Sequence, residues 1–324
     1  MKKLLAAGCW LFISPILKAH PGIGIVKDAR GNIYYTDLKQ IWRISPDGNK
    51  TVAVANVHSH ELYIDEQDNL YGEHLWYNGE AKNTWGHYAW CLKSNGDLVK
   101  DRAPSQGFLT NYSFVRDSTG NMYWVERFTT SRIMMKSKTG EIKKLAEGRF
   151  AFIGWLFCTK DGVLYFTEDN KMHRLLPNGK LETVAENIGS RSTDFTVMGH
   201  NYDSYGIWTD AAENIYVAMI DSKKVIRIRP NEKPETILNS NSLWTVTSGL
   251  FDNSGNLWVL ENSATNEVRV RKIDLRLESA RIANAGVFQP HLVITILTAI
   301  AVVILFLATQ MIINKKKKKV QFAH

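Results

Sequence analysis

The stretch VRDSTGNMYWVE, residues 115–126, joins an Asp-x-x-Gly-Asn turn to an apolar run. Turn formers between two segments of alternating apolar and polar residues are typical of a β-hairpin. The pattern occurs six times in the chain, and the Asn is replaced only once, by Val163. The other five copies are VKDARGNIYYTD (26–37), YIDEQDNLYGEH (63–74), CTKDGVLYFTED (158–169), WTDAAENIYVAM (208–219) and LFDNSGNLWVLE (250–261).

These repeats recur at intervals of 37 to 52 residues, and a second hairpin follows in most of them. Examples are IWRISPDGNKTVAVA (41–55) and HRLLPNGKLETVA (173–185). Two hairpins make one four-stranded antiparallel blade, and the interval matches the period of a β-propeller. We therefore predict an all-β six-bladed β-propeller over residues 20–290. The sixth unit shows no clear second turn after Ile273, so the sequence does not locate its last strand.

The two ends of the chain predict secretion and anchoring in a membrane. A basic start, an apolar run and Ala19 are typical of a secretory signal peptide over residues 1–19, although residues 6–9 also resemble a lipoprotein box ending at Cys9. Residues 292–313 carry no charge and are followed by lysines 315–319. This pattern predicts a transmembrane helix (291–314) and a basic cytoplasmic tail (315–324). The prediction is a single-pass cell-membrane protein with its propeller on the periplasmic or extracellular side.

Charge and cysteine content narrow the function classes. The formal charge of +8 comes from Lys2, Lys3, Lys18 and the tail lysines, which leaves 32 basic and 32 acidic residues in the rest of the chain. The propeller therefore gives no reason to expect nucleic acid as a partner. Cys91 and Cys158 are the cysteines left after the signal peptide, and they suit either one disulfide or two buried thiols.

Antiparallel geometry predicts which polar residues meet. The segment entering the first strand of a blade and the end of its second strand must lie on one face of the disk, with the Asp-x-x-Gly-Asn turns on the other. The ends of the second strands give Asp37, His74, Glu126, Glu168 and Glu261, with Glu73 beside His74. The entering segments and a long insertion in the second unit add His20, His58, His60, Glu61, His200, Asp203, Trp76, Trp85 and His87.

From this face we predict a site at the mouth of the central channel. His60, His74 and His200 are the predicted metal ligands, with His20 and His58 as further candidates. Imidazole with carboxylate suits zinc, iron or manganese better than calcium. Glu61 or Glu73 is the predicted general base. The predicted substrate-binding residues are Asp37, Trp76, Trp85, His87, Glu126, Glu168, Asp203 and Glu261.

Simpler interpretations stand beside these predictions. Charged residues at strand ends are commonly solvated loop starts. The histidines also suit a hydrogen-bonded polar layer around the channel, and the tryptophans suit packing over a long loop. His173, in a predicted third strand away from this face, is interpreted as structural.

The hairpin pattern, followed by I-x-R-I-x-P-D/N-G, resembles the NHL-repeat and gluconolactonase/regucalcin-like six-bladed propellers. The resemblance covers nearly the whole propeller and implies the architecture. Gluconolactonase-like enzymes hold a divalent cation with a glutamate from a Glu-Gly-Pro stretch; this chain has His20-Pro21-Gly22 there, so none of those ligands is transferred. The related amidating lyases use three zinc-binding histidines, and His60 and His200 lie in segments that fit such a site.

Two hypotheses of function follow. The first is a membrane-anchored propeller with a metal-assisted hydrolase or lyase activity on a lactone, ester or sugar-like small molecule. The second is a non-catalytic module that presents the aromatic insertion to a protein or glycan. No nucleotide-binding glycine loop and no G-x-S-x-G serine motif occurs in the sequence.

Overall fold

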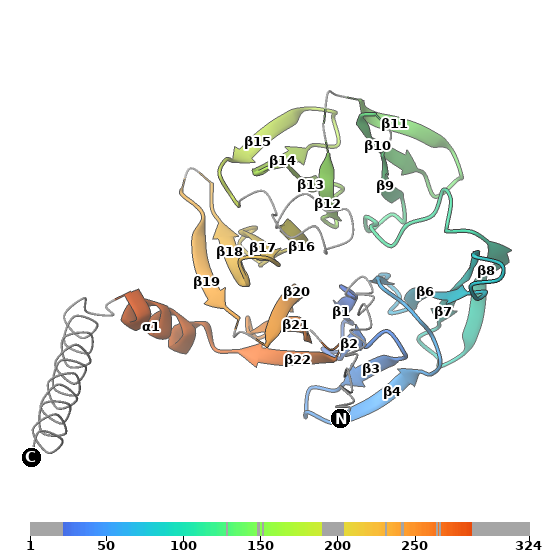
Figure 1. Ribbon diagram of the computed structural model, residues 1–324, viewed down its shortest axis with the longest axis horizontal. Coiled ribbons are helices and arrows are strands. Elements are labelled where there is room, and N and C mark those ends of the chain that lie inside the picture. Colours follow the sequence, from blue (N-terminus) through green and yellow to red (C-terminus); the bar gives the residue numbers. More distant parts are fainter. Residues whose placement is uncertain are drawn as a thin grey trace, which may run out of the picture. The chain divides into compact units, whose positions relative to one another are not determined.

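The computed structural model describes residues 22–286 except 128, 148–149, 151, 190–203, 231, 241–242, 264 and 266. Six antiparallel sheets surround a central opening (Figure 1). We number these sheets as blades 1 to 6 in chain order. The predicted all-β six-bladed propeller is therefore confirmed, and its strands follow one another in sequence order within every blade.

Blades 1 and 2 each contain four strands, and the strands of blade 2 are longer. The first strand of each blade is the innermost one (Figure 1). The eight strands are β1 (Ile25–Lys27), β2 (Ile33–Thr36), β3 (Ile41–Ile44), β4 (Lys50–Val54), β5 (Leu62–Ile64), β6 (Leu70–Tyr77), β7 (Trp85–Leu92) and β8 (Leu98–Gln106).

Blades 4 and 5 repeat the four-stranded arrangement with strands of five or six residues. Their second strands are largely buried, because both faces of a blade pack on neighbouring blades. The eight strands are β12 (Ile153–Cys158), β13 (Leu164–Glu168), β14 (Lys171–Leu175), β15 (Leu181–Ala185), β16 (Ser204–Thr209), β17 (Ile215–Met219), β18 (Lys224–Ile228) and β19 (Glu235–Asn239).

Blade 3 differs from the prediction because it has three hydrogen-bonded strands: β9 (Met122–Arg127), β10 (Ser131–Lys136) and β11 (Ile142–Glu147). The inner position holds only an isolated bridge between Arg116 and Met122. Ser113 explains the change, since its hydroxyl accepts the Val115 N–H (3.0 Å) and its carbonyl accepts the Arg116 side chain (2.8 Å). Local bonds of this kind compete with a strand ladder.

Blade 6 contains β20 (Trp244–Phe251), β21 (Leu257–Ser263) and β22 (Val268–Ile273). The chain then enters α1 (Leu275–Gly286), so the described residues contain no fourth strand here. This outcome agrees with the missing turn signal after Ile273.

The Asp-x-x-Gly-Asn turns all require one left-handed residue directly before the Asn position. Glycine takes this conformation in four blades, for example Gly120 with a φ of 88°. Asp68 (φ 59°) and Glu213 (φ 60°) take this conformation in blades 2 and 5, where the Cβ atom of a residue other than glycine makes unfavourable steric contacts with the backbone.

The ring closes between blades 6 and 1 through side chains. Thr247 Oγ1 donates to the Gly22 carbonyl (2.9 Å), and Lys27 Nζ donates to the Phe251 carbonyl (2.9 Å). Fully buried Leu260 packs in a cluster with the apolar side chains of blade 1. Side-chain contacts between blades 6 and 1 therefore close the ring, and the stability of each blade depends on its neighbours.

A second compact unit, residues 276–324, contains most of α1. Within the described part of the chain, no helix combines the length and apolarity that a membrane span needs. The predicted signal peptide (1–19) and the predicted span (291–314) both lie outside the described residues.

Candidate functional site

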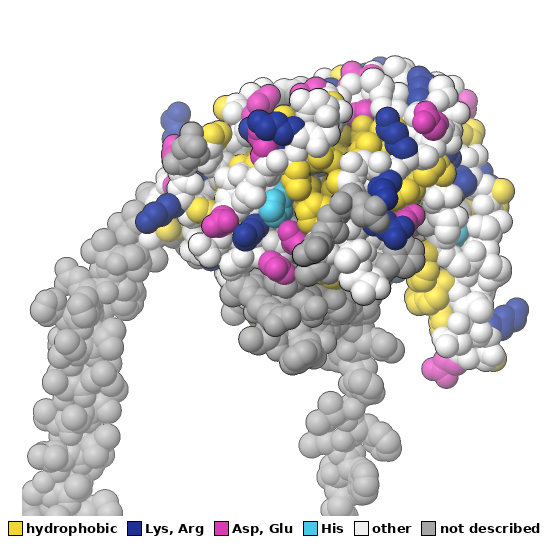
Figure 2. All heavy atoms as spheres, turned by 90° about the horizontal axis from the view of Figure 1, so that it is seen from above, with side chains coloured by type: hydrophobic (Ala, Val, Ile, Leu, Met, Phe, Trp, Pro, Cys, Tyr) yellow, Lys and Arg dark blue, Asp and Glu magenta, His cyan; other side chains and the backbone are white. Residues whose placement is uncertain are grey.

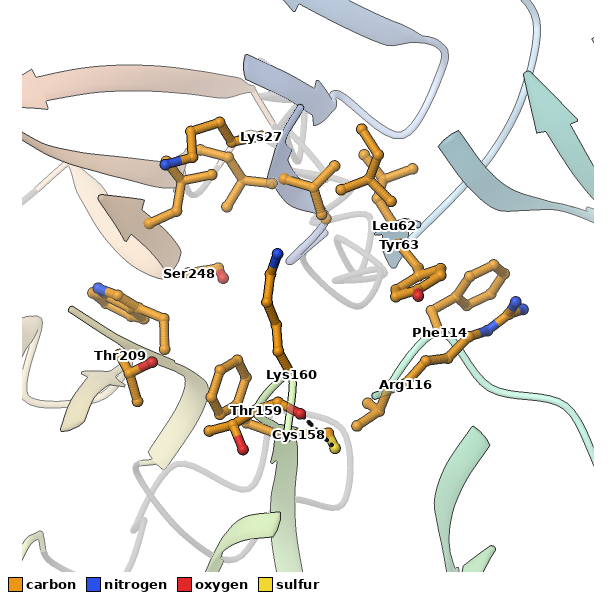
Figure 3. Close-up of a pocket in the computed structure, with 18 of the residues that line it drawn as sticks. Lys27, Leu62, Tyr63, Phe114, Arg116, Cys158, Thr159, Lys160, Thr209 and Ser248 are labelled. Atoms are coloured by element: carbon orange, nitrogen blue, oxygen red, sulfur yellow. Dashed lines mark hydrogen bonds between the residues drawn. The ribbon is translucent and has the colours of Figure 1, made fainter. Parts of the chain in front are cut away.

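The inner strands enclose a cavity of about 910 Å³. All six blades contribute to its wall, and blade 3 does so through residues 114–118. Figure 3 shows Lys160 of blade 4 reaching into the opening, where its ammonium pairs with Glu66 (3.0 Å). Its lining runs along the inner segments of the blades, from the residues that enter the first strands to the Asp-x-x-Gly-Asn turns. We call the face of the disk with the Asp-x-x-Gly-Asn turns the turn face and the opposite one the mouth face.

On the turn face, the repeat aspartates hold their own hairpins. In blade 3, Asp117 accepts hydrogen bonds from the Asn121 N–H (3.0 Å), the Asn121 amide (2.8 Å) and the Tyr123 hydroxyl (2.6 Å). The same three bonds recur in blades 1, 2, 5 and 6, with the aromatic donor six residues after the Asp; the other four pairs are Asp28/Tyr34, Asp65/Tyr71, Asp210/Tyr216 and Asp252/Trp258.

These bonds determine the charge state of the carboxyl groups. Burial by itself raises the pKa of Asp65, Asp117, Asp210 and Asp252, but the hydrogen bonds from the turn outweigh it and hold each pKa below its ordinary value. These four carboxylates are therefore ionised and already bonded within the fold.

On the mouth face, residues 58–61 run between blade 1 and strand β6. The His60 carbonyl accepts the Ile23 and Gly24 N–H groups (2.9 and 2.8 Å), and the His58 carbonyl accepts the Leu75 N–H (3.0 Å). The Ser59 carbonyl accepts the Thr36 hydroxyl (2.6 Å). These bonds to blade 1 and β6 fix the backbone of this segment.

The structure brings together five predicted residues from blade 2, His58, His60, Glu61, Glu73 and His74, which we call the mouth cluster. His58 Nε2 and His60 Nε2 lie 3.3 Å apart, and His60 Nδ1 lies 3.5 Å from Glu73 Oε1. Burial lowers the pKa of His58, and His60 lowers it further, so this imidazole is neutral near pH 7.

His74 has a different position in the cluster. Its Nδ1 accepts the His58 N–H (3.1 Å), and burial lowers its pKa. A neutral imidazole that accepts at Nδ1 carries its proton on Nε2, so His74 offers a donor to a ligand rather than a lone pair. Its ring stacks on Trp76, with centroids 5.8 Å apart.

Glu61 is the member of the mouth cluster that lines the cavity. Burial, reinforced by the charge of Glu73, raises its pKa to about 7, while His60 and Arg127 act in the opposite direction. Arg127, at the end of β9, donates to the carbonyls of Ile153 and Gly154 (3.0 and 3.1 Å). Sequence reasoning missed Arg127, although it directly follows Glu126 at a strand end.

Four other predicted residues do not belong to the mouth cluster; Asp37, Glu126 and Glu168 lie at or next to the ends of β2, β9 and β13, whereas Glu261 lies inside β21. Asp37 accepts the Lys39 and Gln40 N–H groups (both 2.9 Å) and the Trp42 indole (2.7 Å). Fully buried Glu261 pairs with two arginines of β22. Glu126 accepts the indole of Trp124 (3.4 Å), and Glu168 lies 3.4 Å from His173 Nε2. None of these four carboxylates lines the cavity.

The insertion of blade 2 forms the extended hairpin of β6 and β7. His87 is buried there, with Nδ1 bonded to the Gly107 carbonyl (2.5 Å) and Nε2 to the Ser105 hydroxyl (3.2 Å). Trp76 covers Gly86, where a Cβ would come within 2.3 Å of its ring. Trp85 is 38% exposed near the tip.

Three predicted residues, His20, His200 and Asp203, lie outside the described residues. Among the residues that are described, no group of three or more His, Cys, Asp or Glu side chains is arranged to hold a metal ion. Cys91 and Cys158 are both buried free thiols, which decides between the two alternatives left open by the sequence.

Comparisons with known proteins give similarity in fold only. No family model matches the chain. No curated protein matches it either. Among solved structures, a protein of unknown function from Bacteroides thetaiotaomicron is 13% identical over 79% of this chain and 70% of that one, with a TM-score of 0.52. An auxiliary nutrient binding protein from Bacteroides ovatus is 12% identical over 79% and 70%, with a TM-score of 0.51.

Virginiamycin B lyase from Staphylococcus aureus is 15% identical over 78% of this chain and 85% of that one, with a TM-score of 0.45. At these identities the likeness shows the fold alone. The six-bladed architecture implied by the resemblance in sequence is the one that the chain adopts.

Proposed function

We propose that the protein is an extracytoplasmic, membrane-anchored propeller that binds a small molecule in its central cavity and acts on it at the mouth face as a hydrolase or lyase. The observation that carries this proposal is the position of Glu61. Glu61 lines the cavity, and the charges of His60 and Glu73 act on its carboxyl group. A cavity of about 910 Å³ falls within the usual size range of ligand sites.

Glu61 is suited to proton transfer on a bound substrate. It lines the cavity and directly follows the segment whose backbone is held by blade 1 and β6, so its backbone is fixed before a ligand binds. Glu73 and His60 form a pair with each other, and the charges of both act on Glu61. We assign Glu61 the role of general acid or base on a lactone, ester or sugar-like substrate, with His74 donating a hydrogen bond.

A divalent metal ion is the second part of the proposal. Two nitrogen ligands of a tetrahedral zinc ion at 2.0–2.1 Å are about 3.3–3.4 Å apart. The Nε2 atoms of His58 and His60 have this separation, 3.3 Å. Glu73 faces the other nitrogen of His60, as carboxylates behind ligating histidines do. Such an ion supplies Lewis acidity toward a substrate oxygen.

An activity assay on the full chain tests the catalytic part. We expect hydrolysis or elimination with at least one member of a panel of lactones, aryl esters and uronic-acid disaccharides. Glu61→Gln should lower kcat at least 100-fold, because it removes the proton-transfer group while keeping the shape. Glu141→Gln, at an exposed residue that does not line the cavity, is the matched control and should retain full activity.

Equal activity in Glu61→Gln and the wild-type protein would refute the assignment of Glu61. A full panel without turnover, in a protein that still binds a panel member, would instead support a non-catalytic binding module.

The membrane part is tested separately. In intact cells with a C-terminal epitope tag, we expect added protease to digest the propeller while the tag stays protected. Recovery of the protein in the soluble fraction, or digestion of the tag, would contradict the anchored topology.

A further inference from the structure

The hairpin of blade 2 carries an aromatic surface that the cavity does not use. Tyr77, Trp85 and Phe108 are 40%, 38% and 63% exposed, and their rings form a continuous row. The centroids of Tyr77 and Trp85 are 4.9 Å apart, and those of Trp85 and Phe108 are 6.1 Å apart. We call these three residues the aromatic platform. Exposed apolar patches of this kind mark interaction sites.

The platform is held rigidly by its surroundings. Strands β6 and β7 run for eight residues each, and Trp76 closes over Gly86 beneath the tip. The Trp85 carbonyl accepts the Gly107 N–H (2.7 Å), which fixes the approach to Phe108. In Figure 2 the right-hand part of the described surface, where Figure 1 places β6–β8, projects beyond the rest. A preorganised row of rings loses little conformational entropy on binding.

The polar groups around the rings are amides and hydroxyls. Asn83 accepts the Tyr77 hydroxyl (3.1 Å), while Asn78 bonds Thr84 (3.0 Å) and Gln106 (3.2 Å). The loop between the two strands carries one acidic and one basic residue, Glu80 and Lys82, which cancel in charge. The platform therefore matches an uncharged ligand that has flat apolar faces and many hydroxyl groups.

We propose that the aromatic platform binds a neutral carbohydrate chain. The C–H face of a sugar ring packs on an aromatic face because the ring quadrupole is negative there, and amide side chains bond the equatorial hydroxyls. The ring plane of Trp85 is inclined by 44° to that of Tyr77 and by 28° to that of Phe108. The ring spacings of 4.9 and 6.1 Å suit successive sugar units.

The platform also lies on the same side of the disk as the mouth cluster. Strand β6 passes through Glu73 and His74 and ends at Tyr77, so the platform is about 10 Å beyond His74 at the usual rise per residue. The binding site itself does not depend on the proposed activity, because Tyr77, Trp85 and Phe108 do not line the cavity.

Retention of the full chain in affinity gels containing cellulose-derived, xylan, mannan or starch polysaccharides tests the proposal. We expect binding to at least one of these neutral polymers, confirmed by a fluorescence titration with the matching hexasaccharide. Trp85→Ala and Phe108→Ala should each weaken binding about tenfold or more, since each removes a stacking face. Trp85→Phe should restore most of the affinity.

Leu243→Ala, which removes another exposed apolar side chain (69% exposed), is the control and should bind as the wild type does. No retention by any of the four polymers overturns the proposal, as does equal binding by Trp85→Ala. Binding to phosphatidylcholine vesicles that depends on Trp85, without binding to polysaccharide, would assign the platform to the lipid surface and overturn it as well. Glu61→Gln should leave polysaccharide binding unchanged, which separates this proposal from the proposed activity.

Discussion

The turn face and the mouth face lie at opposite ends of the same inner strands and use polar side chains differently. On the turn face, five blades repeat one network of Asp, Asn and an aromatic residue, as Asp117 does with Asn121 and Tyr123. On the mouth face, the histidines and glutamates that come together all belong to blade 2. The network that recurs in five of the six blades holds the fold, whereas the mouth cluster occurs once and is available to a ligand.

The largest effect should come from acid, because it acts on all turn-face networks together. Asp65, Asp117, Asp210 and Asp252 each have a lowered pKa in the fold. Their stabilisation is complete above the unfolded pKa of about 3.9 and is lost as pH falls through the lower folded pKa. Melts of the full chain should show Tm falling steeply below pH 4. A flat Tm between pH 5 and pH 3 would contradict this role.

Removing one network should have the next largest effect. Asp117→Ala leaves Asn121, Thr119 and the buried Tyr123 hydroxyl without their shared acceptor. We expect a loss of about 3 kcal/mol in the free energy of unfolding, measured by denaturant titration. The control is Asp161→Ala in blade 4, where Thr159 stands in the Asp position and makes the turn bond to the Val163 N–H (3.0 Å); it should cost below about 1 kcal/mol.

Glu261 distinguishes a buried structural carboxylate from a ligand-binding one. It pairs with Arg269 (2.6 Å) and Arg271 (2.8 Å), whose side chains are about one-third exposed. Because water partly screens both arginines, we expect Glu261→Ala to cost about 2 kcal/mol rather than the full value for a buried pair. Ligand binding in the cavity should be unaffected. A tenfold loss of ligand affinity at unchanged stability would instead show that Glu261 belongs to the ligand-binding site.

The smallest effect should come from replacing Glu213 by glycine, the residue that four other blades have at the same position of the turn. Glu213 has a positive φ (60°) at the position where four other blades have glycine. Glu213→Gly should raise the free energy of unfolding by up to about 1 kcal/mol, because relief of the left-handed strain exceeds the entropy cost of glycine. A matched Glu186→Gly change, at an exposed residue outside these turns, should not stabilise the protein.

The sequence predicts the repeated features well and the unique ones incompletely. The six hairpins and the convergence of His58, His60, Glu73 and His74 follow from turn chemistry and antiparallel direction. The partners of Glu261 depend on the β21–β22 register, in which Glu261 lies opposite Arg269, and no local pattern specifies that register. The aromatic hydrogen-bond donor of each turn could have been predicted from the sequence, because it always stands two residues after the Asn and six after the Asp.

The missing inner strand of blade 3 and the burial of Glu61 arise from long-range packing. Ser113 and Arg116 replace the strand ladder with side-chain bonds, which the alternation of apolar residues does not indicate. The environment of Glu61 depends on Arg127, which ends strand β9 in the next blade. Such contacts become visible only when neighbouring blades are placed side by side.

Metal affinity of the full chain tests the contrast between the two faces most directly. Competition with a chromophoric chelator should show one Zn²⁺, Mn²⁺ or Fe²⁺ bound per chain, with His60→Ala weakening it at least 100-fold and Glu66→Gln, on the turn face, leaving it unchanged. A protein that binds none of the three ions, or binds them equally well after His60→Ala, would contradict the assignment of the mouth cluster.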